Sequence, residues 1–290
     1  MSATEAHAAQ AGSLAVAGKV VPRLGFGAMQ LPKAAANDRT EAVRAVRRAV
    51  ELGVRFIDTS GYYGPDIANE VIAEAVHPYP DDLVIASKVG ARRAGNSFVA
   101  ADTADEISRA VEHDLTVLRL ETLDLVHARR MPDSTTPYVE MIAALDRLRE
   151  RGLVRHIGVS NVDQQLLDAA QRIAPIASIE NEFNIAQTTN DQLVSAAESG
   201  GLAFLPFHPL ALGSLAEADS PLAKTAADLG ATPAQLAIAW LLHRSPAILP
   251  IPGTSSARHV EDNIAAAALQ LAHTRWEALT ADVTVSTPSG

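Results

Sequence analysis

The chain of 290 residues has no cysteine and no long apolar run, and its charge is mainly acidic. Without cysteine it can form neither a disulfide nor a thiolate nucleophile, and a reducing, cytoplasmic location is expected. No apolar stretch reaches the roughly 18 residues that a membrane span needs. The formal net charge is -10 and there is no basic stripe, which argues against nucleic acid as a partner. What remains is the composition of an ordinary globular protein, 48% hydrophobic, with a sizeable core.

Lysine is also scarce, which draws attention to one position. It occurs only as Lys19, Lys33, Lys88 and Lys224. Of these, Lys88 alone is flanked on both sides by strand-like apolar residues, in LVIASKVG. A lysine at the end of a buried strand needs a partner for its charge, so Lys88 is a candidate functional residue.

The amino-terminal residues differ in character from the rest of the chain. Residues 1–19 begin with MSATEAHAAQAGS, which has no basic region followed by an apolar core. We therefore expect a flexible tail rather than a signal peptide. The interior has no linker-like stretch, so residues 20–290 are predicted to form one barrel domain.

From residue 20 onward, short β-branched runs alternate with longer stretches of helical period. Strands are predicted over residues 23–28, 55–59, 83–89, 122–128, 154–159, 177–183, 202–207 and 247–251. Helices are predicted near residues 40–52, 67–76, 103–118, 137–151, 163–173, 189–199, 232–243, 257–267 and 274–280. Strand–helix alternation indicates a parallel sheet, and eight repeats indicate a closed (β/α)₈ (TIM) barrel.

A doubly wound open sheet is the competing fold. It would normally carry a glycine-rich dinucleotide turn after the first strand. Gly25 and Gly27 come nearest, but Gln30 stands in place of the third glycine and Leu31-Pro32 follow instead of a helix. We interpret the two glycines as positions of close backbone packing at the mouth of a barrel.

Polar residues follow the predicted strands one after another, at the end where such barrels place their chemistry. Asp58 and Tyr63 follow the second strand, Lys88 ends the third and His127 ends the fourth. A neighbouring ammonium would lower the phenol pKa of Tyr63, and Asp58 would balance that ammonium. His127 could hydrogen-bond a carbonyl oxygen. The set favours carbonyl reduction, with a hydride from a cofactor and Tyr63 as the general acid.

Each of these residues also has a structural interpretation. Asp58 and Lys88 could be an ion pair, Tyr63 a loop aromatic and His127 a core histidine. Their joint placement favours catalysis. A second enzyme class, in which Lys88 forms a Schiff base, would need a free amine with a lowered pKa. The histidines lack a ligand spacing at a common strand end, so no metal site is predicted.

Several segments carry a family resemblance that spans about residues 20–272: RLGFGAMQL, FIDTSGYYGPDIANE, IASKVGARR, LDLVHARRM, GLVRHIGVSN, IENEFN and ATPAQLAIAWLLHRSPAILPIPGTSSARHVEDN. They resemble the aldo-keto reductases, and within them the bacterial pyridoxal reductase (pyridoxine 4-dehydrogenase) group. The resemblance implies a TIM barrel, NADPH/NADP+ in preference to NADH, and a tetrad of Asp58, Tyr63, Lys88 and His127. The implied activity is reduction of aldehydes or ketones to alcohols, with pyridoxal to pyridoxine as the leading case. A keto-sugar or xenobiotic ketone as substrate, and a non-catalytic NADPH-binding barrel, are the alternatives.

The resemblance also assigns a cofactor site. Ser160 and Asn161 would meet the nicotinamide amide, and Phe207 would stack on its ring. Glu180 stands where the family commonly has glutamine, and Gly253 where many members have a phosphate-binding lysine, which leaves Arg258 for the 2′-phosphate. The full expected set is Gly27, Met29, Ser160, Asn161, Glu180, Phe207, Pro209, Leu210, Gly213, Ile251, Gly253, Thr254, Ser255, Ser256, Arg258, Asp262 and Asn263.

The substrate is expected to be a small carbonyl compound in an open, polar pocket. Its predicted walls are residues 129–137, residues 208–221 and the tail after Leu271. Tyr62, Arg129 and His208 are the predicted contacts. The chain is expected to act without nucleic acid or membrane, as a monomer or small homo-oligomer.

Overall fold

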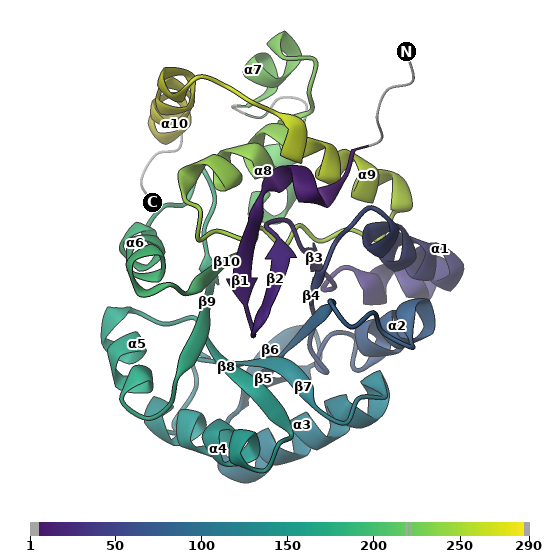
Figure 1. The fold of residues 1–290 in the computed structure, drawn as a ribbon, viewed down its shortest axis with the longest axis vertical. Coiled ribbons are helices and arrows are strands. Elements are labelled where there is room, and N and C mark those ends of the chain that lie inside the picture. Colours follow the sequence, from purple (N-terminus) through teal and green to yellow (C-terminus); the bar gives the residue numbers. More distant parts are fainter. Residues whose placement is uncertain (1–5, 218–219, 221, 287–290) are drawn as a thin grey trace.

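The protein is a barrel of parallel strands ringed by helices (Figure 1). The computed structural model describes residues 6–217, 220 and 222–286. The barrel strands are hydrogen-bonded in the order β10-β9-β8-β7-β5-β4-β3, so neighbours in space follow the order of the chain. Their bounds are Phe26–Gly27 (β3), Phe56–Asp58 (β4), Val84–Ala94 (β5), Leu123–Arg129 (β7), Val154–Ser160 (β8), Ile176–Glu182 (β9) and Ala203–Phe207 (β10).

The barrel closes through residues 247–253, where the sequence predicts the eighth strand. The Leu249 amide donates to the Phe204 carbonyl at 2.9 Å, and the Gly25 amide donates to the Pro250 carbonyl at 2.9 Å. The segment pairs only through isolated parallel bridges, because prolines 250 and 252 have no amide proton for a regular ladder. The predicted (β/α)₈ barrel in a single domain is thereby confirmed, with an irregular eighth strand.

The helices predicted from the sequence are all present, most of them with small shifts at their ends. The first is the exception: it already begins at Leu31-Pro32, where no helix was expected, and is interrupted at the non-helical residue Asp38. Among the described residues the helices are Leu31–Glu51 (α1), Ile67–Val76 (α2), Ala104–Leu118 (α3), Tyr138–Glu150 (α4), Gln164–Gln171 (α5), Asp191–Gly200 (α6), Pro233–Arg244 (α8), Ala257–Ala265 (α9) and His273–Ser286 (α10). The short helix α7 (Ala223–Asp228) and the 3₁₀ turns η1 (Ala8–Ala11), η2 (Ala211–Ala216) and η3 (Ala266–Ala268) were not predicted. Helix α8 starts where expected, because Thr232 and Gln235 form a capping box.

The amino-terminal residues differ from the expected flexible tail. After η1, residues Ser13–Val16 (β1) and Lys19–Pro22 (β2) form an antiparallel hairpin. The hairpin lies across the centre of the barrel in Figure 1, over the end where the strands begin. Val16 and Val21 are buried there in one apolar cluster with Phe56 and Leu205. The segment is ordered because these side chains close the open base of the barrel.

The side chains that face the barrel interior change from apolar to charged along the strands. Phe56, Val84 and Leu125 belong to the apolar cluster above the hairpin. Two residues further along the same strands lie Asp58, Ala86 and His127, and Lys88 pairs in register with His127. Since strand side chains alternate with a period of two, these residues face the same interior one layer higher. The charged layer therefore sits near the carboxyl ends of the strands.

A second hairpin, which the sequence analysis did not foresee, extends one wall of the barrel. Strand β5 runs on past the barrel to Ala94 and turns back through Gly95-Asn96 into Ser97–Ala101 (β6). Strand β6 of this hairpin is held against the loop after β7, because the Ala100 amide donates to the Asp133 carboxylate at 3.1 Å. This hairpin brings Phe98 to the mouth of the barrel.

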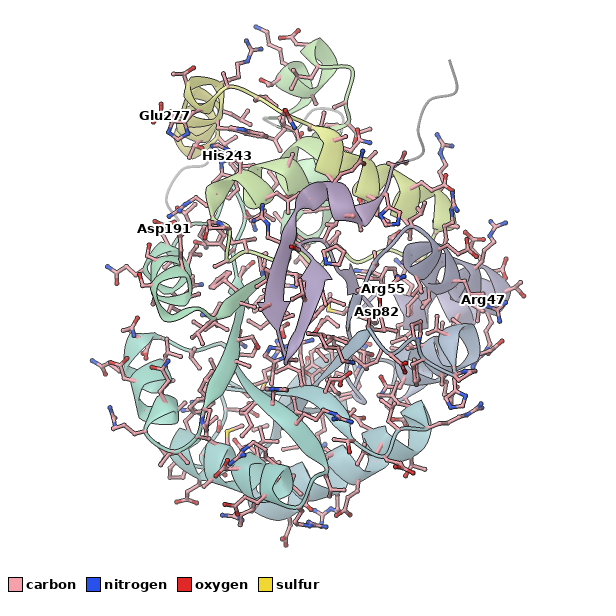
Figure 2. All side chains as sticks on the ribbon, viewed as in Figure 1. Arg47, Arg55, Asp82, Asp191, His243 and Glu277 are labelled. Carbon is pink, nitrogen blue, oxygen red and sulfur yellow. The ribbon has the colours of Figure 1, made fainter. Side chains whose placement is uncertain are left out.

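Ion pairs join elements around the outside of the barrel. Arg55 and Asp82, at the starts of β4 and β5, lie 2.7 Å apart and appear side by side in Figure 2. Helix α10 packs on α8, where Trp240 donates to Thr280 at 2.8 Å and His243 stacks on Trp276. Among the described residues, no helix is both long and apolar enough to cross a membrane.

Candidate active site

A buried cluster of charges lies at the carboxyl ends of β4, β5 and β9. The Lys88 ammonium donates to the Asp58 carboxylate and to the Thr59 carbonyl at 3.3 Å, and lies 3.3 Å from a Glu180 oxygen. All three charged side chains are almost completely buried. Lys88 thus sits between two carboxylates, of which the sequence analysis foresaw only Asp58 as its partner.

The sharing of one ammonium by two carboxylates explains the pKa directions. Burial, then repulsion from Glu180, raise the pKa of Asp58 to about 6, although Lys88 acts to lower it. Burial acts to lower the pKa of Lys88, but Asp58 and Glu180 outweigh it and hold that pKa well above its usual value. Lys88 is therefore a charged ammonium and cannot act as the free amine that a Schiff-base mechanism needs.

Tyr63 lies against this cluster, with the Lys88 ammonium 5.3 Å from the centre of its ring. Burial raises the pKa of Tyr63, and the opposing effect of Lys88 does not overcome it. Lys88 acts to lower this pKa, as expected, but burial, which the sequence analysis did not weigh, has the larger effect. The consequence is a phenol that keeps its proton at neutral pH, which is the form a proton donor requires.

His127 lies deeper than the expected role requires. Its side chain is completely buried, with Nε2 2.9 Å from the Ser178 hydroxyl and Nδ1 3.3 Å from a Glu180 oxygen. Burial, then the charge of Lys88, lower the pKa of His127 to about 3, so the ring is neutral. Gly158 makes room for it, since a Cβ there would lie 2.3 Å from the imidazole Cδ2. The ring is not among the residues that line the cavity described next.

A cavity of about 400 Å³ opens above the charged layer. Tyr63, Asp58 and Glu180 form its floor, and Phe98, Arg129 and Phe207 form its walls. From there it extends along residues 207–213 to Gly253, on the far side of the mouth. Its lining residues are Gly27, Met29, Gln30, Asp58, Tyr63, Phe98, Arg129, Glu180, Phe207, His208, Pro209, Leu210, Leu212, Gly213, Ile251 and Gly253.

Most of the predicted cofactor residues meet in this cavity. Those that line it are Gly27, Met29, Glu180, Phe207, Pro209, Leu210, Gly213, Ile251 and Gly253. Gly27 and Gly253 pair across the barrel seam, and a Cβ at Gly27 would lie 2.6 Å from the Ile251 carbonyl oxygen. The close packing predicted for Gly27 is thus present, because no other residue fits there.

Ser160 and Asn161 lie at the end of β8, outside the lining of this cavity. The Ser160 hydroxyl is buried and has no hydrogen-bond partner among the described residues. Asn161 has a φ of 57° and donates from its side chain to the Arg130 carbonyl at 3.2 Å. The Ser160 hydroxyl is therefore free to bond a ligand group, whereas the Asn161 amide already uses one of its N–H donors.

The predicted phosphate residues lie apart from the cavity, around the start of α9. Arg258 is exposed and lines a separate surface hollow between α1 and α9. The amide of Ala257 at this helix start donates to the Glu41 carboxylate at 2.9 Å. An anion of the chain itself therefore occupies part of the helix terminus that we expected to hold a phosphate. The other residues predicted for this end, which the cavity lining does not include, are Thr254, Ser255, Ser256, Asp262 and Asn263.

Of the three predicted substrate contacts, two line the cavity and one does not. Arg129 and His208 line the cavity, while Tyr62 is buried behind it, edge-on to both Tyr63 and Phe98. The tail after Leu271 forms no part of the lining among the described residues, since α10 packs on α8 instead. Phe98 and Gln30 line the cavity but were not predicted. The Gly95-Asn96 pair was the available signal for Phe98, because such a pair favours a hairpin turn.

The same layer also has the composition of a cation site. Asp58, His127 and Glu180 place ligand atoms within 4.8 Å of one another. The ammonium of Lys88 already lies between the two carboxylates, so it occupies the position a cation would take. The prediction that the chain has no metal site therefore stays unaltered.

Comparison with known proteins decides the family. The family model described as Aldo/keto reductase family matches residues 23–282. The chain belongs to this family. The reductase is 44% identical to pyridoxine 4-dehydrogenase of Escherichia coli over 263 residues, which cover 87% of the chain and 92% of that relative. It is 34% identical to an uncharacterized oxidoreductase of Schizosaccharomyces pombe, over 91% of the chain and 87% of the relative. The chain is thus an oxidoreductase of this family.

Solved structures agree with this assignment of the aldo/keto reductase. An aldo-keto reductase from Klebsiella pneumoniae, in complex with NADPH, superposes with a TM-score of 0.81 at 26% identity and covers 94% of this chain and 95% of its own. The glycerol dehydrogenase of Gluconobacter oxydans superposes with a TM-score of 0.86 at 21% identity, over 97% of both chains. The second likeness supports the barrel fold alone.

Proposed function

We propose that this aldo/keto reductase reduces aldehydes or ketones to alcohols with NADPH. The observation that carries the proposal is Tyr63, a protonated phenol that faces the cavity and lies against the buried ammonium of Lys88. A protonated phenol can give its proton to an oxygen that gains negative charge. The Lys88 ammonium then stabilises the phenolate that remains, because its Nζ lies 5.3 Å from the centre of the Tyr63 ring.

The cavity suits a nicotinamide cofactor. Phe207 offers an aromatic face in its wall, and Ser160 offers a buried hydroxyl without a partner at the neighbouring strand end. Glu180 also lines the cavity, and a carboxylate can accept from an amide NH₂. When bound there, the cofactor supplies the hydride that the carbonyl carbon needs. NADP+ and NADPH are favoured over NADH by the solved relatives from Klebsiella pneumoniae, whose complexes contain NADPH and NADP.

Pyridoxal is the leading substrate. The relative with 44% identity is a pyridoxine 4-dehydrogenase, which supports a substrate of this kind. The cavity wall contains the ring of Phe98 and the guanidinium of Arg129, which lie 5.9 Å apart. A planar ring with an aldehyde and an acidic hydroxyl suits a wall that offers an aromatic face and, beside it, a fixed positive charge. A keto-sugar or xenobiotic ketone is the second candidate, since the cavity is open at its rim.

The catalytic reading is favoured over a barrel that only binds NADPH. The paired Asp58 and Lys88, with Tyr63 beside them, would be an expensive arrangement without chemistry, because burying charges costs free energy. We further propose a cytoplasmic location, supported by the absence of cysteine. A monomer or a small homo-oligomer is proposed as the working form.

The experiment is turnover with NADPH that carries deuterium on its transferable position. The panel contains pyridoxal, a keto-sugar and an aromatic ketone, and NADH is assayed in parallel. We expect the alcohol of pyridoxal to carry deuterium on its carbinol carbon, with NADPH preferred. Tight NADPH binding without turnover across the panel would support the non-catalytic barrel. Borohydride trapping of the substrate on Lys88 would support the Schiff-base alternative.

A further inference from the structure

The end of β7 carries two inward-facing polar residues at different depths. His127 and Arg129 are two residues apart, so they face the same side of the strand about 7 Å from each other. In register, His127 lies opposite Lys88 and Gly158, in the charged layer. Arg129 lies opposite Ser160, one step nearer the mouth. The cavity that holds Tyr63 is lined by Arg129 and not by His127.

The contacts of the two side chains also distinguish His127 from Arg129. His127 Nε2 bonds the Ser178 hydroxyl, and Nδ1 lies 3.3 Å from the Glu180 carboxylate without a hydrogen bond, on the side away from the cavity lining. The guanidinium of Arg129 instead lies 5.9 Å from the ring of Phe98 and 6.0 Å from the ring of Phe207, which are both in the cavity wall. Its Nε is buried and has no hydrogen-bond partner within the described part of the chain. Arg129 therefore faces the cavity with an Nε donor that has no bonded acceptor, while, against the opposing effect of burial, the Tyr62 phenol beside its guanidinium helps to raise the pKa of Arg129.

The charge balance of the site leaves this donor available. The positive charge of Lys88 is already matched by Asp58 and Glu180. Arg129 makes no ion pair among the described residues, and it carries its charge at every relevant pH. An oxygen that becomes negative next to Tyr63 would thus find in Arg129 a cation whose Nε donor is free.

We infer that Arg129, and not His127, is the residue that orients the substrate carbonyl and stabilises its oxygen as negative charge develops. The inference rests on the proposed carbonyl reduction. As a hydride adds to the carbonyl carbon, the π electrons of the C=O bond move onto the oxygen. The hydroxyl of Tyr63 then gives its proton to that oxygen, which leaves an alcohol and a phenolate that regains a proton from water. The cofactor is oxidised and the carbonyl is reduced, so electrons and protons balance.

This assignment gives His127 another role, that of a positioning residue. Its neutral ring fills the space above Gly158 and lies against Glu180. Through Glu180 it acts on the charges around Lys88, without contact with the cavity. The substrate carbonyl then meets two side chains, Tyr63 and Arg129, from neighbouring walls of one cavity.

The first test compares Arg129→Gln with wild type and with Arg92→Gln. Arg92 is an exposed arginine on β5 that does not line this cavity, so it controls for the loss of one positive charge. We expect kcat of Arg129→Gln to fall by about 10²–10³-fold, as for loss of an oxyanion donor, with NADPH binding unchanged. Arg92→Gln should keep the wild-type kcat.

The second test is chemical rescue. Arg129→Ala assayed with added guanidinium at a non-denaturing concentration should recover a large part of kcat, and Arg92→Ala should not respond. Arg129→Lys keeps the charge and the long stem, so it guards against loss of folding; we expect its kcat to be about tenfold lower than wild type, since an ammonium lacks the planar fork. Thermal unfolding of each variant reports on the fold.

The outcomes separate this inference from the proposed function. An Arg129→Gln kcat within about threefold of wild type, or no rescue by guanidinium, would overturn the role of Arg129 while carbonyl reduction stands. A wild-type protein without NADPH-dependent turnover would overturn the proposed function itself.

Discussion

Glu180 changes the chemistry of the site more than any other single residue. It adds a second carboxylate next to Lys88, and its other oxygen faces His127. With both carboxylates ionised, the cluster of Asp58, Glu180 and Lys88 carries one net negative charge. Uptake of a proton by Asp58 removes that charge and leaves Lys88 paired with Glu180 alone. The site next to Tyr63 then becomes more favourable for a phenolate.

This arrangement predicts a pH dependence of reduction. As the pH falls through about 6, Asp58 takes up a proton and kcat should rise, because Tyr63 becomes the stronger acid. Glu180→Gln removes the repulsion that raises the pKa of Asp58, so the midpoint of the pH profile should move to lower pH. The measurement is kcat against pH for both proteins.

The matched control is Glu182→Gln, on the same strand but paired with His208 at 3.3 Å. It should leave the midpoint where it is in wild type. An unchanged midpoint in Glu180→Gln would contradict the claim that Asp58 and Glu180 share the Lys88 ammonium.

The sequence could place the charged residues along the strands but could not give their depth. Asp58 and Lys88 were predicted as partners, and the structure pairs them. The roles predicted for these residues and for His127 stay predictions. Period-two alternation puts His127 and Arg129 on the same face, and no pattern in the chain tells which of them reaches the cavity. That depends on the height of the floor, which the register between strands decides.

Among the elements, the amino-terminal hairpin is the one that sequence analysis missed most clearly. The residues that precede it, MSATEAHAAQAG, are mostly small or polar, so the whole segment is typical of a tail. Only contact with the base of the barrel orders it, because a two-stranded hairpin is marginal by itself. Tertiary contacts of this kind leave no local signal beyond the alternation of Val20 and Val21.

The hairpin predicts a contrast between these two neighbours. Val21 is completely buried at the base of the barrel, while Val20 is 71% exposed on the other face of β2. Val21→Ala should lower the free energy of unfolding by about 2 kcal/mol, from lost burial and a small cavity. Val20→Ala should change it by less than about 0.5 kcal/mol. Urea unfolding of the two variants measures both, and equal effects would mean that the hairpin does not seal the barrel.

Helix α3 carries a buried carboxyl that links three elements. Asp114 accepts from the Ser87 hydroxyl on β5 and from the Asn69 amide on α2, the latter at 3.1 Å. Burial, against the hydrogen bond from Ser87, raises the pKa of Asp114 to about 7, with Asp66 adding to the rise and His113 opposing it. The folded protein thus holds this proton more tightly than the unfolded chain does.

The raised pKa of Asp114 therefore makes the folded protein more stable at low pH than at neutral pH. The protonated Asp114 carboxyl contributes on the order of 4 kcal/mol to the free energy of unfolding. This contribution is fully present below about pH 4 and is lost as the pH rises to about 7. Asp114→Asn cannot titrate, so the slope of its unfolding free energy between these pH values should be smaller. Asp105→Asn, an exposed change on the same helix, should keep the wild-type slope. Equal slopes in wild type and Asp114→Asn would contradict the prediction.

At the scale of the whole molecule, the alternation of strands and helices predicted the barrel well. The apolar periodicity is strong because the surrounding helices must cover the sheet and the barrel strands are buried on both faces. The eighth strand is less regular than this alternation predicted. Residues 247–251 are apolar, yet prolines 250 and 252 leave the segment only isolated bridges. The loops and hairpins around the mouth, which shape the cavity, follow no such period.

The whole barrel therefore acts as a frame that brings short segments of distant sequence to one cavity. Tyr63 comes from the loop after β4, Lys88 from β5, Arg129 from β7 and Phe207 from β10. The central claim is that Tyr63 gives the proton at this junction. Tyr63→Phe keeps the ring and the packing against Tyr62 while removing that proton.

The direct measurement is kcat for pyridoxal reduction by Tyr63→Phe, with NADPH affinity measured on the same preparation. The account predicts a fall in kcat of at least about 10²-fold with NADPH affinity unchanged, since a positioned general acid contributes about 10²–10⁴-fold. A Tyr63→Phe protein that reduces pyridoxal at the wild-type rate would contradict it.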